Sequence, residues 1–142
     1  MVETRFSKLN DVNQLVKLDK MANKEIKWWS PKSNNEFKKL INRSKKLIVI
    51  AEDKGKIIGY LDSKFKDDKN TLWIENVYVI KEYRKMNIAK NLIQYLVYNW
   101  RSIENIVLLC SDNNKRIFEK CGFKKTMNYM ELTSRESFII TY

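Results

Sequence analysis

The chain has 142 residues, enough for one sizeable core, and we expect a single domain spanning residues 1–142. No apolar run approaches the ~20 residues of a membrane-spanning helix and no signal peptide is evident, so a cytoplasmic protein is expected. Histidine is absent, which excludes His-based triads and His-ligated zinc. The two cysteines, Cys110 and Cys121, are expected to be small buried hydrophobes, and no metal site is expected.

The formal net charge is +11, from 28 lysines and arginines against 17 acidic residues. A lysine-rich solvated surface explains this charge, and so does a polyanionic partner such as a polyphosphate cofactor or nucleic acid. Because the charges are scattered through the expected helices and loops and form no single tail, charge alone leaves both interpretations open.

The N-terminal part begins with a short expected strand, residues 4–9, followed by a helix that Asp11 caps and that runs to about residue 21. The loop that follows contains the adjacent tryptophans Trp28 and Trp29. Adjacent tryptophans are costly to leave in water, so we expect them either to pack on the core or to line a ligand cleft. A second helix is expected over residues 34–44, where apolar residues recur at helical spacing.

A β-hairpin is expected next, with strands over residues 47–52 and 57–65. Its turn contains Gly55, which suits the positive φ that such turns require. Gly59 lies inside the second strand and indicates a β-bulge or a close backbone approach.

The stretch from residue 71 to residue 100 combines a strand, a basic turn and a helix. Residues 72–80 are mostly β-branched, apolar and aromatic, as in a strand buried on both faces, and apolar positions recur every three or four residues from Ile88. A helix N-terminus presents unpaired N–H groups and a partial positive charge, so the turn is a candidate pyrophosphate site. Further positive charge around it comes from Arg84, Lys85 and Lys90.

The C-terminal part is expected to contain a buried strand at residues 105–110 and closing strands at 123–132 and 138–142. Between them we expect a helix that Ser111 or Asp112 caps and that runs to Lys120, with Cys121-Gly122 as its C-terminal stop. The order β-α-α-β-β-β-α-β-α-β-β predicts a mixed sheet with helices on its faces. With only three glycines in the chain, a P-loop and a Rossmann fingerprint are both excluded.

Three segments resemble the GNAT superfamily of acyl-CoA-dependent N-acyltransferases: the hairpin IVIAEDKGKIIGYL, the segment VYVIKEYRKMNIAKNLI and the late FEKCGF. With the order of elements, the resemblance covers roughly residues 3–132. It implies an α/β (α+β) three-layer fold, in which a mixed, mostly antiparallel sheet of six to seven strands carries about four helices on its faces. It also implies acetyl-CoA as the cosubstrate, without a metal.

The most specific part of the resemblance is residues 77–92, where the family has a strand, then Arg-x-x-Gly-x-Gly/Ala, then a helix. Asn87 replaces the first family glycine, a tolerable change because asparagine adopts positive φ more readily than most non-glycine residues. The strand residues implied to lie along the pantetheine arm and thioester are Val77, Tyr78 and Val79. The loop implied to bind the pyrophosphate through its backbone comprises Arg84, Lys85, Met86, Asn87, Ile88 and Ala89, followed by Lys90.

One departure from the family pattern touches the chemistry. Counting back from Gly122-Phe123, Phe118 occupies the position where many members carry a tyrosine that protonates the leaving thiolate, and a phenyl ring cannot donate a proton. The family's asparagine before that tyrosine falls on Ser111, which leaves Asn113 and Asn114 nearby as candidates for the pantetheine contact. Because the thiolate of coenzyme A is a good leaving group, the lost tyrosine weakens the enzyme interpretation without refuting it.

A general base, or a water relay to one, is expected because an amine of pKa ~10.4 loses its proton at pH 7 at a cost of about 4–5 kcal/mol. Strand alternation predicts that Glu75 shares a face with Val77 and Val79, which makes it the best candidate. An ion pair with a lysine across the sheet is the alternative role for Glu75. Glu52 and Asp112 are weaker candidates.

The resemblance implies an acceptor site around residues 22–33 and 126–137, where Trp28, Trp29 and Tyr129 would provide aromatic walls. We expect an N-acetyltransferase that transfers an acetyl group from acetyl-CoA to a primary amine, of a small molecule or a peptide, by direct attack in a ternary complex. The alternative is a catalytically degenerate member or basic module that binds coenzyme A, a protein partner or nucleic acid. Nucleic acid is not favoured, no membrane partner is expected, and homodimerisation is left open.

Overall fold

The computed structural model describes residues 1–26, 30–66, 70–112 and 114–126. The elements in chain order are β1 (Val2–Phe6), the 3-10 turn η1 (Leu9–Asp11), α1 (Val12–Ile26), α2 (Asn34–Arg43), β2 (Ile48–Asp53), β3 (Lys56–Phe65), β4 (Thr71–Val79), the 3-10 turn η2 (Lys81–Tyr83), α3 (Ile88–Asn99), β5 (Asn105–Leu108) and α4 (Lys115–Lys120).

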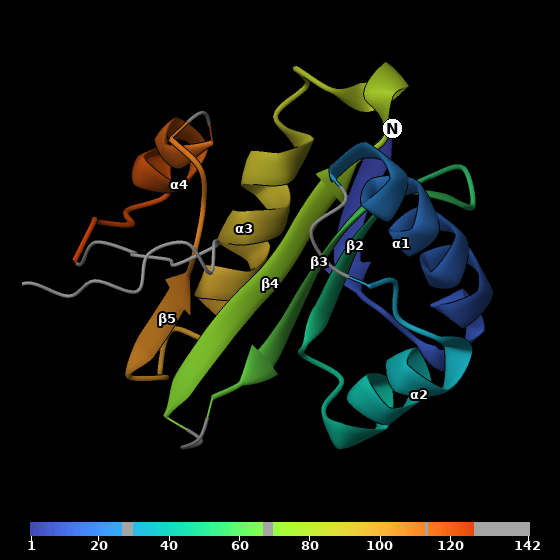
Figure 1. The fold of residues 1–142 in the computed structure, drawn as a ribbon, viewed down its shortest axis with the longest axis horizontal. Coiled ribbons are helices and arrows are strands. Elements are labelled where there is room, and N and C mark those ends of the chain that lie inside the picture. The colour runs from blue at the N-terminus through green and yellow to red at the C-terminus, as the bar shows by residue number, and fades with distance from the viewer. Residues whose placement is uncertain (27–29, 67–69, 113, 127–142) are drawn as a thin grey trace, which may run out of the picture.

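The strands form one mixed sheet in the order β1-β2-β3-β4-β5. Strands β1 to β4 are antiparallel neighbours and β5 runs parallel to β4. Helices α1 and α2 lie on one side of the sheet and α3 on the other (Figure 1). The predicted α/β fold with a mostly antiparallel sheet is therefore confirmed. Five strands are described where six to seven were expected, since residues 127–142 of the expected closing strands lie outside the described residues.

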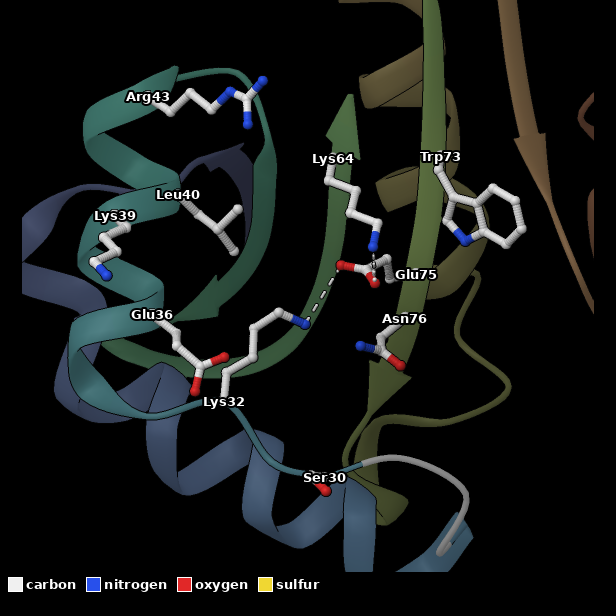
Figure 2. A pocket seen from close by; sticks show the side chains of 10 residues that line it. All are labelled: Ser30, Lys32, Glu36, Lys39, Leu40, Arg43, Lys64, Trp73, Glu75 and Asn76. Carbon is white, nitrogen blue, oxygen red and sulfur yellow. Dashed lines mark ion pairs between the residues drawn. The ribbon is translucent and has the colours of Figure 1, made fainter. Parts of the chain in front are cut away.

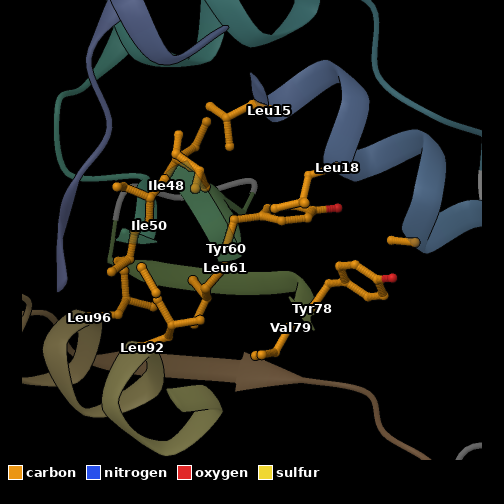
Figure 3. Close-up of a cluster of buried hydrophobic side chains, with 14 of the residues drawn as sticks. Leu15, Leu18, Ile48, Ile50, Tyr60, Leu61, Tyr78, Val79, Leu92 and Leu96 are labelled. Carbon is orange, nitrogen blue, oxygen red and sulfur yellow. The ribbon is translucent and has the colours of Figure 1, made fainter. Parts of the chain in front are cut away.

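The core has two layers, one on each face of the sheet. Figure 3 shows Leu15 and Leu18 of α1 on one side of the strands and Leu92 and Leu96 of α3 on the other. All four side chains are at most 5% exposed, as the helical spacing of apolar residues in both segments predicts. Burying side chains of this kind contributes roughly 1.5–3 kcal/mol each, so these two layers fix the helices against the sheet.

The beginning of the chain differs from the prediction. Strand β1 ends at Phe6, and Asp11 caps the 3-10 turn instead of α1, accepting a 2.8 Å hydrogen bond from the Lys8 N–H and two bonds from the Arg5 guanidinium. Helix α1 continues to Ile26, beyond the expected residue 21, because the buried Ala22 extends its apolar stripe.

The two cysteines lie in different environments. Cys110, which follows β5, is exposed, so its prediction as a buried hydrophobe is wrong, and Cys121 at the end of α4 is half-buried. Burial raises the pKa of each thiol, so neither is an activated thiolate.

Both glycine predictions in the hairpin are confirmed. Lys54 and Gly55 have φ of 49° and 82°, the positive values of a tight hairpin turn. Between the pairs Ala51–Gly59 and Glu52–Ile57 the register shifts, so Ile58 is an extra, bulged residue. A Cβ on Gly59 would lie 3.1 Å from the Tyr78 carbonyl oxygen, so the absent side chain lets β3 approach β4 there.

Candidate active site

Strand β4 extends well past its parallel neighbour. Pairing with β5 covers only Thr71 to Ile74, and the rest of β4 has no strand partner on that side within the described residues. Figure 1 shows the chain after β5 turning away towards α4. A stretch of β4 backbone is thus left with one open edge at the centre of the sheet.

The hydrogen-bonding register shows which β4 groups face that open edge. The Ile80 N–H donates to the Ile58 carbonyl at 2.9 Å, next to the Gly59–Val79 pair. Hydrogen-bonded and non-hydrogen-bonded pairs alternate along an antiparallel ladder, so Val79 and Val77 direct their N–H and C=O groups away from β3. These backbone groups face the open edge of β4, beyond the stretch that pairs with β5. The resemblance implies that the pantetheine arm binds along this edge.

Beyond β4, the loop into α3 has the backbone of an anion site. Lys85 and Asn87 have φ of 65° and 63°, so the positive φ predicted for Asn87 is confirmed. Asn87 is the N-cap of α3, and its side chain accepts no hydrogen bond from the first turn. The N–H groups of Ile88, Ala89 and Lys90 therefore remain available at the positive end of the helix dipole.

Arg84 ties this loop to two other elements. Its Nε donates to the Val79 carbonyl at 2.9 Å, and a terminal nitrogen lies 2.7 Å from a Glu25 carboxylate oxygen of α1. The Tyr78 hydroxyl donates to the other Glu25 oxygen at 2.8 Å. Burial and this carboxylate raise the pKa of Tyr78 to about 12. The Arg84 guanidinium is thus bonded within the protein, whereas Lys85 and Lys90 form no ion pair with a described residue.

The predicted position of Glu75 is wrong. The β3–β4 register passes from the Asp62–Asn76 pair to the Ser63–Ile74 pair, so Glu75 is a bulged residue that interrupts strand alternation. Glu75 and Asn76 both line a pocket beside α2, whereas Figure 3 shows Val79 directed to the α3 side. Glu75 therefore does not share a face with Val79.

Glu75 makes the ion pairs that were its alternative role. One carboxylate oxygen lies 3.6 Å from Lys32 Nζ and the other 3.3 Å from Lys64 Nζ, across the strand pair. Figure 2 shows the carboxylate between the two ammonium groups. Both carboxylate oxygens are therefore engaged by lysine side chains.

A buried polar cluster lies beneath this pocket. Asp62 accepts hydrogen bonds from Lys32 Nζ at 2.9 Å and from the Asn76 amide at 3.1 Å and 3.3 Å. Asp19 of α1 accepts from the Tyr60 hydroxyl and, at 2.6 Å, from the Lys32 backbone N–H. Both carboxylates are fully buried. The cluster therefore fixes the segment before α2 to α1 and to the centre of the sheet.

The charges of this cluster are perturbed by burial. Burial raises the pKa of Asp62 to about 6, although the Lys32 ammonium opposes the shift. Burial alone would lower the pKa of Lys32, but the charges of Asp62 and Glu75 outweigh it and raise that pKa. Lys32 is accordingly a cation at neutral pH. Asp62, with a pKa of about 6, gains or loses its proton close to neutral pH.

The pocket above the cluster has a volume of about 600 Å³. It lies between α2 and the central strands, and Figure 2 shows its lining side chains. They come from the segment before α2, from α2 itself, from β3 and from β4: Ser30, Lys32, Glu36, Lys39, Leu40, Arg43, Lys64, Trp73, Glu75 and Asn76. Since Asn76 directly precedes Val77, one end of the pocket adjoins the open edge of β4.

The remaining predicted residues are placed as follows. Trp28, Trp29, Tyr129 and Asn113 lie outside the described residues. Asn114 is the N-cap of α4, which begins at Lys115 and not directly after Ser111 or Asp112. Phe118 packs edge-on against Phe123 with ring centroids 5.8 Å apart. Of the weaker base candidates, Glu52 pairs with Arg5 at 2.9 Å and Asp112 is exposed.

Sequence reasoning missed the buried acids of the cluster, although the sequence carries a signal for them. Asp19 occupies a position in the apolar stripe of α1, between the buried Leu18 and Ala22. Asp62 directly follows the apolar run of residues 57–61 in β3 and is itself buried. A charged residue where the period requires an apolar one indicates a buried partner, here Lys32.

Two further features concern the described part of the chain. It contains no group of three or more His, Cys, Asp or Glu side chains arranged to hold a metal ion. Among its helices, none has the length and apolar character needed to cross a membrane.

Solved structures of acetyltransferases share this fold. Diaminobutyrate acetyltransferase from Paenibacillus lautus, solved with L-2,4-diaminobutyric acid and coenzyme A, matches with a TM-score of 0.71 and 21% identity over 84% of this chain and 74% of that one. Glucosamine-6-phosphate N-acetyltransferase from Arabidopsis thaliana matches with a TM-score of 0.69 and 21% identity over 94% and 99%. A predicted acetyltransferase from Clostridium acetobutylicum, solved with acetyl-CoA, matches with a TM-score of 0.68 and 23% identity over 94% and 96%. At these identities the likeness shows the fold.

No curated protein matches the sequence. A family model does: the model of the acetyltransferase (GNAT) family matches residues 10–123, from η1 to the residues after α4. The match spans most of the chain and includes the open edge of β4 and the loop into α3. The chain therefore belongs to the GNAT family of acetyltransferases.

Proposed function

We propose that this protein is an N-acetyltransferase that transfers the acetyl group of acetyl-CoA to a primary amine by direct attack in a ternary complex. The observation that carries the proposal is the continuity of two features. The open backbone edge at Val77 and Val79 leads, through the short turn η2, into the positive-φ loop and the unpaired N–H groups at the start of α3. Solved members of the fold with coenzyme A or acetyl-CoA bound support the choice of cosubstrate.

The residues present suit this cosubstrate. The N–H groups of Ile88, Ala89 and Lys90, with the helix dipole behind them, would bind the pyrophosphate. The backbone groups of Val77 and Val79 would pair with the amides of the pantetheine arm as a short added strand. The Val79 carbonyl already accepts from Arg84, so its N–H is the group left to polarise the thioester carbonyl.

The transfer itself makes modest demands on side chains. The amine nitrogen attacks the thioester carbonyl carbon, the C–S bond breaks, and coenzyme A leaves as a thiolate while the ammonium proton passes to solvent or a base. Phe118 supplies no proton to the thiolate, which leaves unassisted. Glu75 is held by Lys32 and Lys64, so we assign proton removal to water at the pocket mouth, with Glu75 orienting it.

The cations that line the pocket outnumber its carboxylates, which also helps the amine to lose its proton. Like charges nearby disfavour the charged form of a bound ammonium and lower its pKa. Each unit of lowered pKa removes about 1.4 kcal/mol from the deprotonation cost at neutral pH. A strong dedicated base is accordingly less necessary here than in a neutral site.

A catalytically degenerate coenzyme A-binding protein is the second candidate, favoured by the phenyl ring at Phe118. One assay separates the two. Purified protein is incubated with acetyl-CoA and single amines, including L-2,4-diaminobutyrate, glucosamine 6-phosphate, an aminoglycoside and a short peptide, and thiol release is followed with mass analysis of the acceptor. Acetylated acceptor is the expected result. Binding of acetyl-CoA with no acetylated product from a broad amine panel would establish the degenerate alternative.

A further inference from the structure

The pocket between α2 and the central strands has an excess of positive charge. Four cations line it, Lys32, Lys39, Arg43 and Lys64, against two carboxylates, Glu36 and Glu75. Counting the buried Asp62 beneath the pocket still leaves the cations in excess. A concave surface with one sign of charge concentrates ligands of the opposite sign.

The unneutralised charge lies on α2. Lys32 is paired with Asp62 at 2.9 Å and Lys64 with Glu75 at 3.3 Å. Lys39 and Arg43 form no ion pair with any described residue, although the Arg43 guanidinium lies over the Phe65 ring at 5.5 Å. Being four residues apart, they occupy the same face of the helix and line the same wall.

The opposite wall is where an amine would react. Figure 2 shows Glu75 and Asn76 on β4, across the pocket from α2. Asn76 is followed by Val77, at the open edge where the thioester is assigned. A ligand in this pocket would therefore place one end at the α2 cations and the other beside the reacting carbonyl.

We propose that the acceptor is an amine that also carries a phosphate or carboxylate group, which Lys39 and Arg43 bind while the amino group reaches the Glu75–Asn76 end of the pocket. This proposal rests on the acetyltransferase function proposed above. Both side chains line the pocket and can donate charge-assisted hydrogen bonds to an oxyanion. A polycation such as an aminoglycoside would instead meet like charges on α2.

The test compares amines in matched pairs that differ only in the anionic group. Glucosamine 6-phosphate against glucosamine tests a phosphate, and L-2,4-diaminobutyrate against 1,3-diaminopropane tests a carboxylate. Calorimetric affinity for the protein saturated with coenzyme A, and kcat/KM with acetyl-CoA, are measured for each. The anionic member of at least one pair is expected to exceed its partner about tenfold or more in both quantities.

Charge-neutralising variants assign that preference to the α2 cations. The double variant Lys39→Gln/Arg43→Gln should reduce the preference about tenfold. The matched control, Lys38→Gln/Lys45→Gln, removes the same charge from exposed positions outside the pocket and should retain it. Equal loss in both double variants would attribute the preference to overall charge and overturn the site.

The outcomes separate this inference from the function on which it rests. Acetylation of amines without preference for the anionic member of either pair overturns the inference and leaves the acetyltransferase function standing. Tighter binding of the anionic members that depends on Lys39 and Arg43, with no acetylated product, supports the anion site and overturns the function instead.

Discussion

Asp62 offers a sharp test of how the pocket floor is held together. Its carboxylate is fully buried, and burial raises its pKa from the ordinary 3.8 to about 6. Because the folded-state pKa is raised, the folded state binds more protons than the unfolded state between about pH 4 and pH 6. Each pKa unit corresponds to 1.36 kcal/mol, so protonated Asp62 stabilises the folded state by roughly 3 kcal/mol at low pH. This contribution is lost as the pH rises from below 4 through 6.

The variant Asp62→Asn keeps the size of the side chain and removes this titration. Its free energy of unfolding, relative to that of the unsubstituted protein, should therefore increase by about 2–3 kcal/mol between pH 4 and pH 7. Urea unfolding followed by tryptophan fluorescence at several pH values measures this difference. Glu82→Gln, at an exposed position, is the control and should show no such trend. A relative stability that falls with rising pH would refute the reasoning, since it would mean that the Lys32 ion pair outweighs burial and lowers the pKa of Asp62.

Three further predictions concern the cosubstrate site. Arg84→Gln removes the hydrogen bond to the Val79 carbonyl and should weaken acetyl-CoA binding, measured by calorimetry, about tenfold. Glu25→Gln keeps that hydrogen bond and should leave the affinity unchanged. Equal weakening in both variants would assign the effect to the ion pair with α1. Asn87→Gly should match or exceed the stability of the protein in urea, and Asn87→Val should lose about 1–2 kcal/mol because of the positive φ; equal stability of the two variants would contradict this. Gly59→Ala places a Cβ 3.1 Å from the Tyr78 carbonyl oxygen and should lower the free energy of unfolding by about 1–3 kcal/mol. It should also weaken acetyl-CoA binding. Unchanged affinity would show that binding does not need the close approach of β3 to β4.

Local rules in the sequence account for much of the fold. The hairpin turn at Gly55, the strained backbone at Asn87 and the apolar stripes of the helices each follow from a few neighbouring residues. The end of α4 at Lys120, followed by Gly122 with φ of 95°, is another such case. These features are predictable because the cause and the effect lie within one or two turns of chain.

The features that sequence reasoning placed wrongly depend on pairing between distant segments. Glu75 changes face because of a bulge set by the β3–β4 register, and no glycine marks it. The partners of Asp62, Lys32 and Asn76, are brought to it by tertiary packing and strand pairing. Arg84 has the charge expected for a phosphate contact, but its guanidinium is bonded to Glu25. Glu25 lies in the part of α1 beyond its predicted end at residue 21. The positive wall of the pocket likewise appears only when α2 is set against β3 and β4.

The central claim is that acetyl-CoA lies along the open edge of β4 with its pyrophosphate at the start of α3. Amide nitrogen and proton shifts measured by NMR during an acetyl-CoA titration test it directly. The largest shifts are expected at the amides of Val77, Val79, Ile88, Ala89 and Lys90. The absence of any shift at high micromolar acetyl-CoA, or shifts confined to β1 and β2, would contradict it.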